Sequence, residues 1–273
     1  MNSVLFDLGI IKIKWYSFFI LLAVLTASII IGKEVKKRKL DEDDFINIIF
    51  YGLISGILGA RLYYVFFNLD YYLNNLKEIL MVWNGGLAIH GGIISALIFL
   101  LIYTKKKKIN LLLLLDTIVI GLIIAQAIGR WGNFFNQEAF GRIISKNYLQ
   151  SLYLPKFIID GMYIDGYYRE PTFLYESGLS TIGFIVLILL RNIKKIKTGY
   201  LTSVYLIWYG LSRLIIETFR SDSLMLGQFK IAQIVSIIGI ISGIVLIYFS
   251  SKNNNIYIYD KIYLCKKGEK KDV

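Results

Sequence analysis

The chain has 273 residues, of which 56% are hydrophobic, and its mean hydropathy is +0.59. Such a composition excludes an ordinary soluble enzyme and favours a polytopic membrane protein built as one domain. The net charge of +12 does not indicate a nucleic-acid partner, because lysines and arginines gather in short clusters between apolar segments. The single cysteine, Cys265, supplies neither a disulfide framework nor a cysteine metal site, so we expect no metal and no cofactor.

Apolar segments follow one another along the chain, and each is long enough to cross a bilayer as a helix. We therefore expect an all-α polytopic membrane protein with seven transmembrane helices in a single domain, residues 1–273. A small outer-face cap is expected at 142–170 and a cytoplasmic tail at 250–273. The expected spans are 16–32, 45–67, 87–103, 111–128, 172–190, 200–219 and 231–249.

Basic clusters set the expected orientation of these spans. The first apolar segment superficially resembles a signal peptide, but the cluster from Lys33 to Lys39 follows it in place of a small-residue cleavage site. Similar clusters at Lys105 to Lys108, at Arg191 to Lys197 and from Lys252 to Lys271 fall on the same side. The positive-inside rule then predicts an outside N-terminus and a cytoplasmic C-terminus.

The second and third spans contain small residues and two unusual polar groups. Gly52, Gly56 and Gly59 have the spacing that lets membrane helices pack closely, and Arg61 interrupts the second span near its outer end. His90, the only histidine, lies at the start of the third span with glycines on both sides. A lone histidine there is either a hydrogen-bonded packing residue or a catalytic group, and the glycines favour access to its ring.

The segment from Gly129 to Arg142 reads GRWGNFFNQEAFGR and places charged and amide groups directly against an apolar helix. Arg130 and Asn133 are three residues apart and are expected to share a helix face. An interfacial arginine that snorkels to the headgroups is the alternative for Arg130. The nearby Glu138 adds further charge, which favours a functional site.

Two other features are informative, one before and one after that segment. Asp116 is near the inner end of the fourth span, about 21 Å along a helix from Arg130, which is too far for an ion pair. In the segment 142–170, Asp160-Gly161 and Asp165-Gly166 are turn signals that predict tight hairpin turns in the cap.

The sixth span carries a stripe of polar residues. Tyr209, Arg213, Glu217 and Arg220 follow one another at steps of four, four and three, so they are expected on one helix face that points inward. An internal Arg/Glu pair that only holds helices together is the alternative. The preceding span begins after Pro171, with Glu176 early in the helix.

These motifs resemble those of the bacterial prolipoprotein diacylglyceryl transferases, and the resemblance covers nearly the whole chain. The family signature corresponds to Gly129–Arg142, and the matching motifs Ile89-His90-Gly91-Gly92, Pro171-Thr172-Phe173-Leu174-Tyr175-Glu176 and the stretch from Tyr209 to Arg220 occur in the same order. Trp15-Tyr16 matches the family's start of the first span.

The resemblance implies a seven-span enzyme of the bacterial cell membrane. It would move the diacylglyceryl group of phosphatidylglycerol onto the thiol of the lipobox cysteine of a prolipoprotein and release glycerol phosphate. Guanidinium groups suit an anionic phosphodiester, and a base favours thiolate formation. Expected catalytic residues are His90, Arg130 and Arg213, and expected substrate-binding residues are Arg130, Tyr16, Asn133, Glu138, Gly141, Tyr209, Glu217, Arg220 and Arg61. Expected partners are phosphatidylglycerol, the lipobox peptide and membrane lipids.

Two other functional classes compete with a transferase. A transporter or channel also places charges inside membrane helices, but here the ionisable residues gather towards one leaflet, and paired interrupted helices are not evident. A purely structural membrane subunit leaves the glycine-flanked His90 and the Arg130 motif unexplained.

Overall fold

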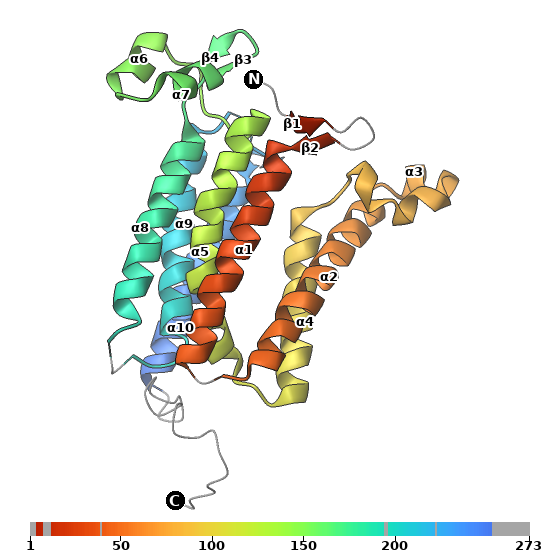
Figure 1. Cartoon of the computed structure of the whole chain (residues 1–273), viewed down its shortest axis with the longest axis vertical. Helices are drawn as coiled ribbons and strands as arrows, with labels where there is room; N and C mark the ends of the chain where they lie inside the picture. The colour runs from red at the N-terminus through yellow and green to blue at the C-terminus, as the bar shows by residue number, and fades with distance from the viewer. Residues whose placement is uncertain (1–3, 8–11, 39, 194–195, 222, 253–273) are drawn as a thin grey trace, which may run out of the picture. The chain divides into compact units, whose positions relative to one another are not determined.

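The computed structural model describes residues 4–7, 12–38, 40–193, 196–221 and 223–252, most of which are helical (Figure 1). Cys265 and nearly all of the expected tail lie outside the described residues. The long helices are α1 (Trp15–Lys37), α2 (Glu42–Phe66), α4 (Ile89–Lys107), α5 (Leu111–Asn136), α8 (Thr172–Leu190), α9 (Tyr200–Phe219) and α10 (Ile231–Lys252). The short helices are α3 (Leu69–Asn74), η1 (Leu76–Leu80), η2 (Val82–Asn84), α6 (Lys146–Ser151) and α7 (Lys156–Gly161).

Within the described residues, six helices are long and apolar enough to cross a membrane, namely α1, α2, α4, α5, α8 and α10. This confirms the expected all-α polytopic membrane fold. α9 is 20 residues long but carries Arg213 and Glu217 among its apolar residues, so the count of seven spans stays a prediction. The structure also extends α5 past the expected end at 128 to Asn136, which places the polar signature residues Arg130 and Asn133 on the helix itself.

The chain divides into two compact units, 1–33 with 115–273, and 34–114. In the first unit, α9 packs against both α8 and α10, and α5 runs alongside (Figure 1). Glycines permit the close approach of α9 and α10, because a Cβ on Gly210 would lie 2.9 Å from the Ser236 carbonyl oxygen and one on Gly243 would lie 2.8 Å from that of Ser203. A fully buried group of Ile120, Ile123, Leu187 and Leu201 belongs to the hydrophobic core of this bundle.

Asp116 fixes the start of α9 from the neighbouring helix α5. Its carboxylate is fully buried and accepts hydrogen bonds from the backbone N–H of Gly199, at 2.6 Å, and of Thr202, at 2.8 Å. The Thr202 hydroxyl donates a third bond at 2.6 Å. These groups are otherwise unpaired at a helix N-terminus, so Asp116 acts as a cap supplied in trans, separate from the Arg130 region.

The segment between α5 and α8 folds into a small cap with its own core of Leu149, Ile158 and Met162, among others, packed against Phe134 of α5. The strands β3 (Tyr163–Ile164) and β4 (Tyr167–Tyr168) form a hairpin. Asp165 and Gly166 make its turn with φ of 50° and 83°, which confirms the predicted hairpin there. The predicted turn at Asp160-Gly161 is wrong, because the helix that begins after Pro155 continues through both residues.

Two further hairpins pair β1 (Val4–Asp7) with β2 (Lys12–Lys14) and β5 (Met225–Leu226) with β6 (Phe229–Lys230). The first precedes α1. The second joins α9 to α10 and brings Lys230 beside the end of α9, where its ammonium group donates to the carbonyl oxygens of Glu217 and Arg220. The β5–β6 hairpin therefore holds the end of α9 in place.

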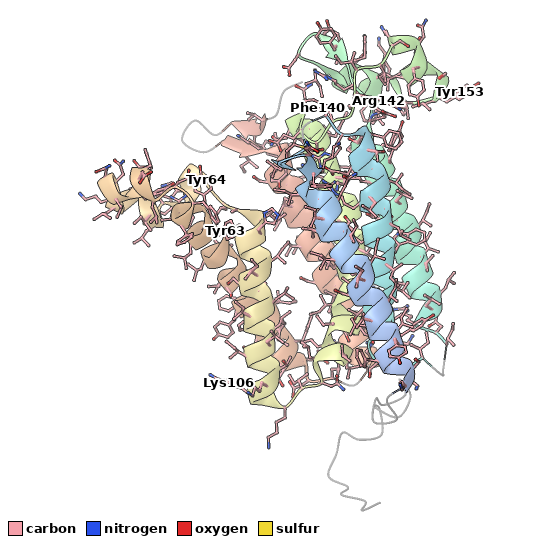
Figure 2. The ribbon with its side chains drawn as sticks, turned by 180° about the vertical axis from the view of Figure 1, so that it is seen from behind. Tyr63, Tyr64, Lys106, Phe140, Arg142 and Tyr153 are labelled. Atoms are coloured by element: carbon pink, nitrogen blue, oxygen red, sulfur yellow. The ribbon has the colours of Figure 1, made fainter. Side chains whose placement is uncertain are left out.

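In the second unit, α2 and α4 pack through small residues. A Cβ on Gly59 would lie 2.1 Å from the Ser95 Cβ, and the Ser55 and Ser95 hydroxyls are 2.7 Å apart. The predicted close packing at the α2 glycines is therefore confirmed for Gly59. Figure 2 shows Tyr63 and Tyr64 towards one end of this unit and Lys106 at the other.

Candidate functional site

Four charged side chains from three helices of the first unit form a continuous set of ion pairs, which we call the Arg–Glu chain. Arg130 Nη2 on α5 lies 2.7 Å from Glu176 Oε2 on α8. The other oxygen of Glu176, Oε1, accepts a hydrogen bond of 2.9 Å from Arg213 Nη1 on α9. Arg213 Nη2 lies 2.7 Å from Glu217 Oε2, one helical turn further along α9. The structure thus brings Arg130, Arg213 and Glu217 together, as the sequence predicted.

The Arg–Glu chain is largely removed from solvent. Its side chains are 19%, 14%, 7% and 2% exposed for Arg130, Arg213, Glu176 and Glu217 respectively. Uncompensated charges at such positions are costly, so each guanidinium is stabilised by a carboxylate. Arginine stays charged even when partly buried, and its planar fork can donate two parallel bonds to a carboxylate or a phosphate. The Arg–Glu chain therefore contains two guanidinium groups, those of Arg130 and Arg213, that are suited to binding an anion.

Asn133 lies beside Arg130 on α5. The Arg130 Nη1 atom is 3.5 Å from Asn133 Oδ1, which confirms that the two residues share a helix face. Tyr16, in the first turn of α1, packs over the same helix, because a Cβ on Gly132 would lie 3.2 Å from its ring. On α9, Tyr209 precedes Arg213 by one turn and stacks on Tyr205 with ring centroids 5.9 Å apart. Tyr16, Asn133 and Tyr209 are thus held in the bundle of the first unit.

Glu138 projects from a strained turn at the end of α5. The residues on either side of it have left-handed backbone, with φ of 53° at Gln137 and 58° at Ala139. Such a conformation costs a residue other than glycine about 1 to 2 kcal/mol, and here the Thr172 hydroxyl fixes the turn by donating to the Ala139 carbonyl oxygen. The Glu138 side chain is exposed and accepts a bond of 2.8 Å from Asn136. Strain retained in this way is typical of functional positions.

Beyond this turn, the signature segment is joined to the start of α8 and the end of α9. Gly141 N–H donates to the Glu170 carbonyl oxygen at 2.9 Å, and Arg142 N–H donates to that of Phe219 at 3.1 Å. A Cβ on Gly141 would lie 2.8 Å from the Glu170 Cβ, so glycine permits this approach. Figure 2 shows Arg142 at the end of the first unit that carries the cap.

The prediction that Arg220 shares a helix face with Arg213 is wrong. α9 ends at Phe219, and Arg220 has an extended backbone with ψ of 136°. Arg220 forms an isolated antiparallel bridge with Gly141 instead. The bridge to Gly141 forms where α9 ends, so the helical spacing of Tyr209, Arg213 and Glu217 does not continue to Arg220.

Arg61, in the second unit, binds backbone carbonyl groups. It is 4% exposed, and its guanidinium donates to the carbonyl oxygens of Glu78, Ile79, Gly85 and Gly86 at 2.5 to 3.1 Å. It therefore fixes the segment that leads into α4. Just before this segment, the Tyr71 hydroxyl donates a hydrogen bond of 2.9 Å to Glu78, which raises the pKa of Tyr71 above its ordinary value.

His90 lies in the first turn of α4 and is partly buried, with its ring centroid 6.4 Å from that of Tyr63. Within the described residues its imidazole has no hydrogen-bond partner. The adjacent Gly91 serves helix packing, because a Cβ there would lie 2.4 Å from the Gly59 carbonyl oxygen. The convergence of His90 and Arg61 with the Arg–Glu chain of the other unit stays a prediction.

The residue that sequence reasoning left out of the site is Glu176, which joins the two arginines. The signal was present, since an acidic residue within an apolar span needs a cation nearby. What the sequence did not supply was the partner, because Glu176 is 46 residues from Arg130 and 37 from Arg213 along the chain.

Comparison with known proteins gives a consistent result. Residues 3–249 match the family model described as prolipoprotein diacylglyceryl transferase. A phosphatidylglycerol–prolipoprotein diacylglyceryl transferase of Listeria innocua is 43% identical over 271 residues, covering 99% of this chain and 98% of the relative. Proteins of the same name from Pediococcus pentosaceus and Staphylococcus xylosus are 46% and 44% identical, covering 93% and 90% of this chain and 91% and 88% of the relatives.

Proposed function

The chain belongs to the prolipoprotein diacylglyceryl transferase family, and on this premise we propose that it transfers the diacylglyceryl group of phosphatidylglycerol to the lipobox cysteine of prolipoproteins. Glycerol phosphate is the second product, and the reaction is the first step of bacterial lipoprotein maturation. The observation that carries the proposal is the pair of partly buried guanidiniums, Arg130 and Arg213, joined within a chain that matches this family along nearly its whole length.

In the proposed reaction the cysteine sulfur attacks the glycerol carbon that bears the phosphate. A carbon–sulfur bond forms, the carbon–oxygen bond to phosphate breaks, and the thiol proton passes to a base. Arg130 and Arg213 bind the phosphate and stabilise the charge that develops on it as the bond breaks. His90 is the proposed base, since a neutral imidazole carries a nitrogen lone pair that can accept the proton of the substrate thiol.

The remaining residues have proposed binding and positioning roles. Asn133 lies beside Arg130, and Tyr16 packs against α5 at Gly132. Both are proposed to orient the glycerol headgroup, together with the exposed carboxylate of Glu138. Glu217 holds Arg213 in register. Gly141, Tyr209 and Arg220 shape the rim of the lipid site, and Arg61 supports the segment before His90 through its backbone contacts.

We further propose that the protein lies in the bacterial cytoplasmic membrane with its N-terminus outside and its C-terminus in the cytoplasm. The cap at 142–170 would then face the compartment in which a translocated precursor presents its lipobox. Cysteine-accessibility scanning in intact cells tests this orientation. Single cysteines introduced at Asp165 and at Lys252, in a chain whose Cys265 is replaced by serine, should be labelled from outside and only after permeabilisation, respectively. The reverse pattern would invert the orientation.

The reaction itself is tested with the purified full chain in phosphatidylglycerol liposomes and a lipobox peptide. The peptide should gain the mass of one diacylglyceryl group on its cysteine, and a peptide with serine in place of cysteine should stay unmodified. The variant Arg213→Gln removes one of the two guanidiniums. Its transfer rate should be at most about 1% of the wild-type rate, since it loses more than one charge-assisted bond to the phosphate. Unmodified cysteine peptide with folded wild-type protein would contradict the proposal.

A further inference from the structure

Glu176 contacts both of the arginines that we assign to the lipid phosphate, as an ion pair with Arg130 and as a hydrogen-bonded ion pair with Arg213. It is almost buried, and its two oxygens contact different guanidiniums at 2.7 Å and 2.9 Å. A phosphate group with two unesterified oxygens presents the same kind of paired acceptors. Glu176 and a bound phosphate therefore compete for the guanidinium groups of Arg130 and Arg213.

This competition matters because the charge on the phosphate changes during the reaction. Phosphatidylglycerol carries a phosphodiester monoanion, whereas a phosphate monoester such as glycerol phosphate carries about −1.5 to −2 at pH 7. Without the Glu176 carboxylate, Arg130 and Arg213 would bind the doubly charged product more tightly than the substrate, which would slow product release. The Arg–Glu chain, with two arginines and two glutamates, is formally neutral when no lipid is bound.

From this arrangement we infer that Glu176 is a positioning residue whose carboxylate returns to Arg130 and Arg213 as the phosphate leaves, and so promotes release of glycerol phosphate. The inference rests on the proposed function. Glu176 makes no bond to the reacting carbon or sulfur and takes no proton in this scheme. Glu217 is placed differently, since its ion pair is with Arg213 at the other side of that guanidinium.

The experiment measures inhibition by added glycerol phosphate during steady-state transfer in phosphatidylglycerol liposomes. Glu176→Gln keeps the size of the side chain and one oxygen acceptor but removes the charge. The inhibition constant of glycerol phosphate should fall by at least about tenfold, the equivalent of one charge-assisted hydrogen bond. kcat should fall with it, whereas KM for phosphatidylglycerol should not rise. Glu176→Asp restores the charge and should move the inhibition constant back towards the wild-type value.

Glu170→Gln is the matched control, because Glu170 is also buried and ion-paired, at 2.9 Å, but with Arg142. Its inhibition constant should equal that of the wild type. If Glu176 only holds helices together, Glu176→Gln will lower the yield of folded protein and kcat with an unchanged or raised inhibition constant, and that result overturns the inference. Should Glu176→Gln not fold, an inhibition constant for Glu176→Asp equal to that of the wild type, at reduced stability, would overturn it equally. Absence of transfer by the wild type would instead refute the proposed function.

Discussion

Replacing Arg130 by lysine keeps a positive charge at the site but removes the planar fork of donors. In the structure, Arg130 uses different nitrogens towards Glu176, at 2.7 Å, and towards Asn133, at 3.5 Å. A lysine ammonium is a single point of charge on a flexible stem, so it can contact Glu176 or a phosphate but cannot bridge groups in two directions. The charge that it retains still compensates the buried carboxylate of Glu176, so the variant should fold.

The expected loss follows from the number of bonds removed. At least one charge-assisted hydrogen bond to the phosphate is lost, at a cost of about 1.5 to 3 kcal/mol. That cost lowers kcat/KM by about 10- to 150-fold if the bond forms in the transition state. A second lost bond would make activity undetectable in an ordinary assay.

The assay is lipobox-peptide transfer in phosphatidylglycerol liposomes, with the amount of folded protein measured in parallel. Arg142→Lys is the matched control, since Arg142 lies in the same signature segment but its side chain is 64% exposed and pairs with Glu170. Lysine keeps a positive charge beside the buried Glu170 carboxylate, and a contact made by so exposed a guanidinium contributes at most about 1 kcal/mol, so this control should lose no more than about fivefold. Wild-type turnover in Arg130→Lys at normal protein levels would refute the phosphate-binding role and favour a snorkelling arginine.

Three further substitutions test other parts of the account. His90→Asn should lower transfer by about 10²- to 10⁴-fold at neutral pH, and the loss should shrink as pH rises past the thiol pKa near 8.5; parallel pH profiles for variant and wild type would exclude the base role. Asp116→Asn should lower the free energy of unfolding by about 1 to 3 kcal/mol, because the charged hydrogen bonds to the start of α9 are weakened. Thermal unfolding in detergent measures this loss, and an unchanged unfolding midpoint would contradict the capping role. Gly141→Ala should destabilise the protein by about 1 to 3 kcal/mol through its clash with Glu170, whereas Gly178→Ala, at a position with open space, should not; equal effects would show that the close approach is unimportant.

The six helices of the described residues that are long and apolar enough to span a membrane could be predicted, because the bilayer fixes the length of an apolar helix and basic residues mark its ends. The pairing of Arg213 with Glu217 was likewise accessible, since residues four apart meet on any helix. The end of that periodicity was not. Arg220 leaves the helix because it pairs with Gly141, a contact that depends on how α5 and α9 are packed.

The centre of the site could also not be predicted from the local sequence pattern. Glu176 was visible as an acidic residue in an apolar span, but its role as the link between Arg130 and Arg213 exists only after α5, α8 and α9 pack together. The strained backbone on both sides of Glu138 could not be predicted either, because neither Gln137 nor Ala139 favours a positive φ. A tertiary hydrogen bond from Thr172 to Ala139 holds this conformation. The sequence predicts which residues can bind or react, whereas the packing of the helices determines which of them are in contact.

The most direct test of the central claim follows the fate of the phosphate. Phosphatidylglycerol labelled in its acyl chains and, separately, in its headgroup glycerol is supplied in liposomes to the wild-type protein with a lipobox peptide. Acyl label should appear on the peptide cysteine as a thioether-linked diacylglyceryl group, and headgroup label should appear in equal amount as water-soluble glycerol phosphate. Headgroup label on the peptide, or release of labelled free glycerol with the phosphate retained on the lipid, would contradict cleavage of the carbon–oxygen bond on the diacylglyceryl side.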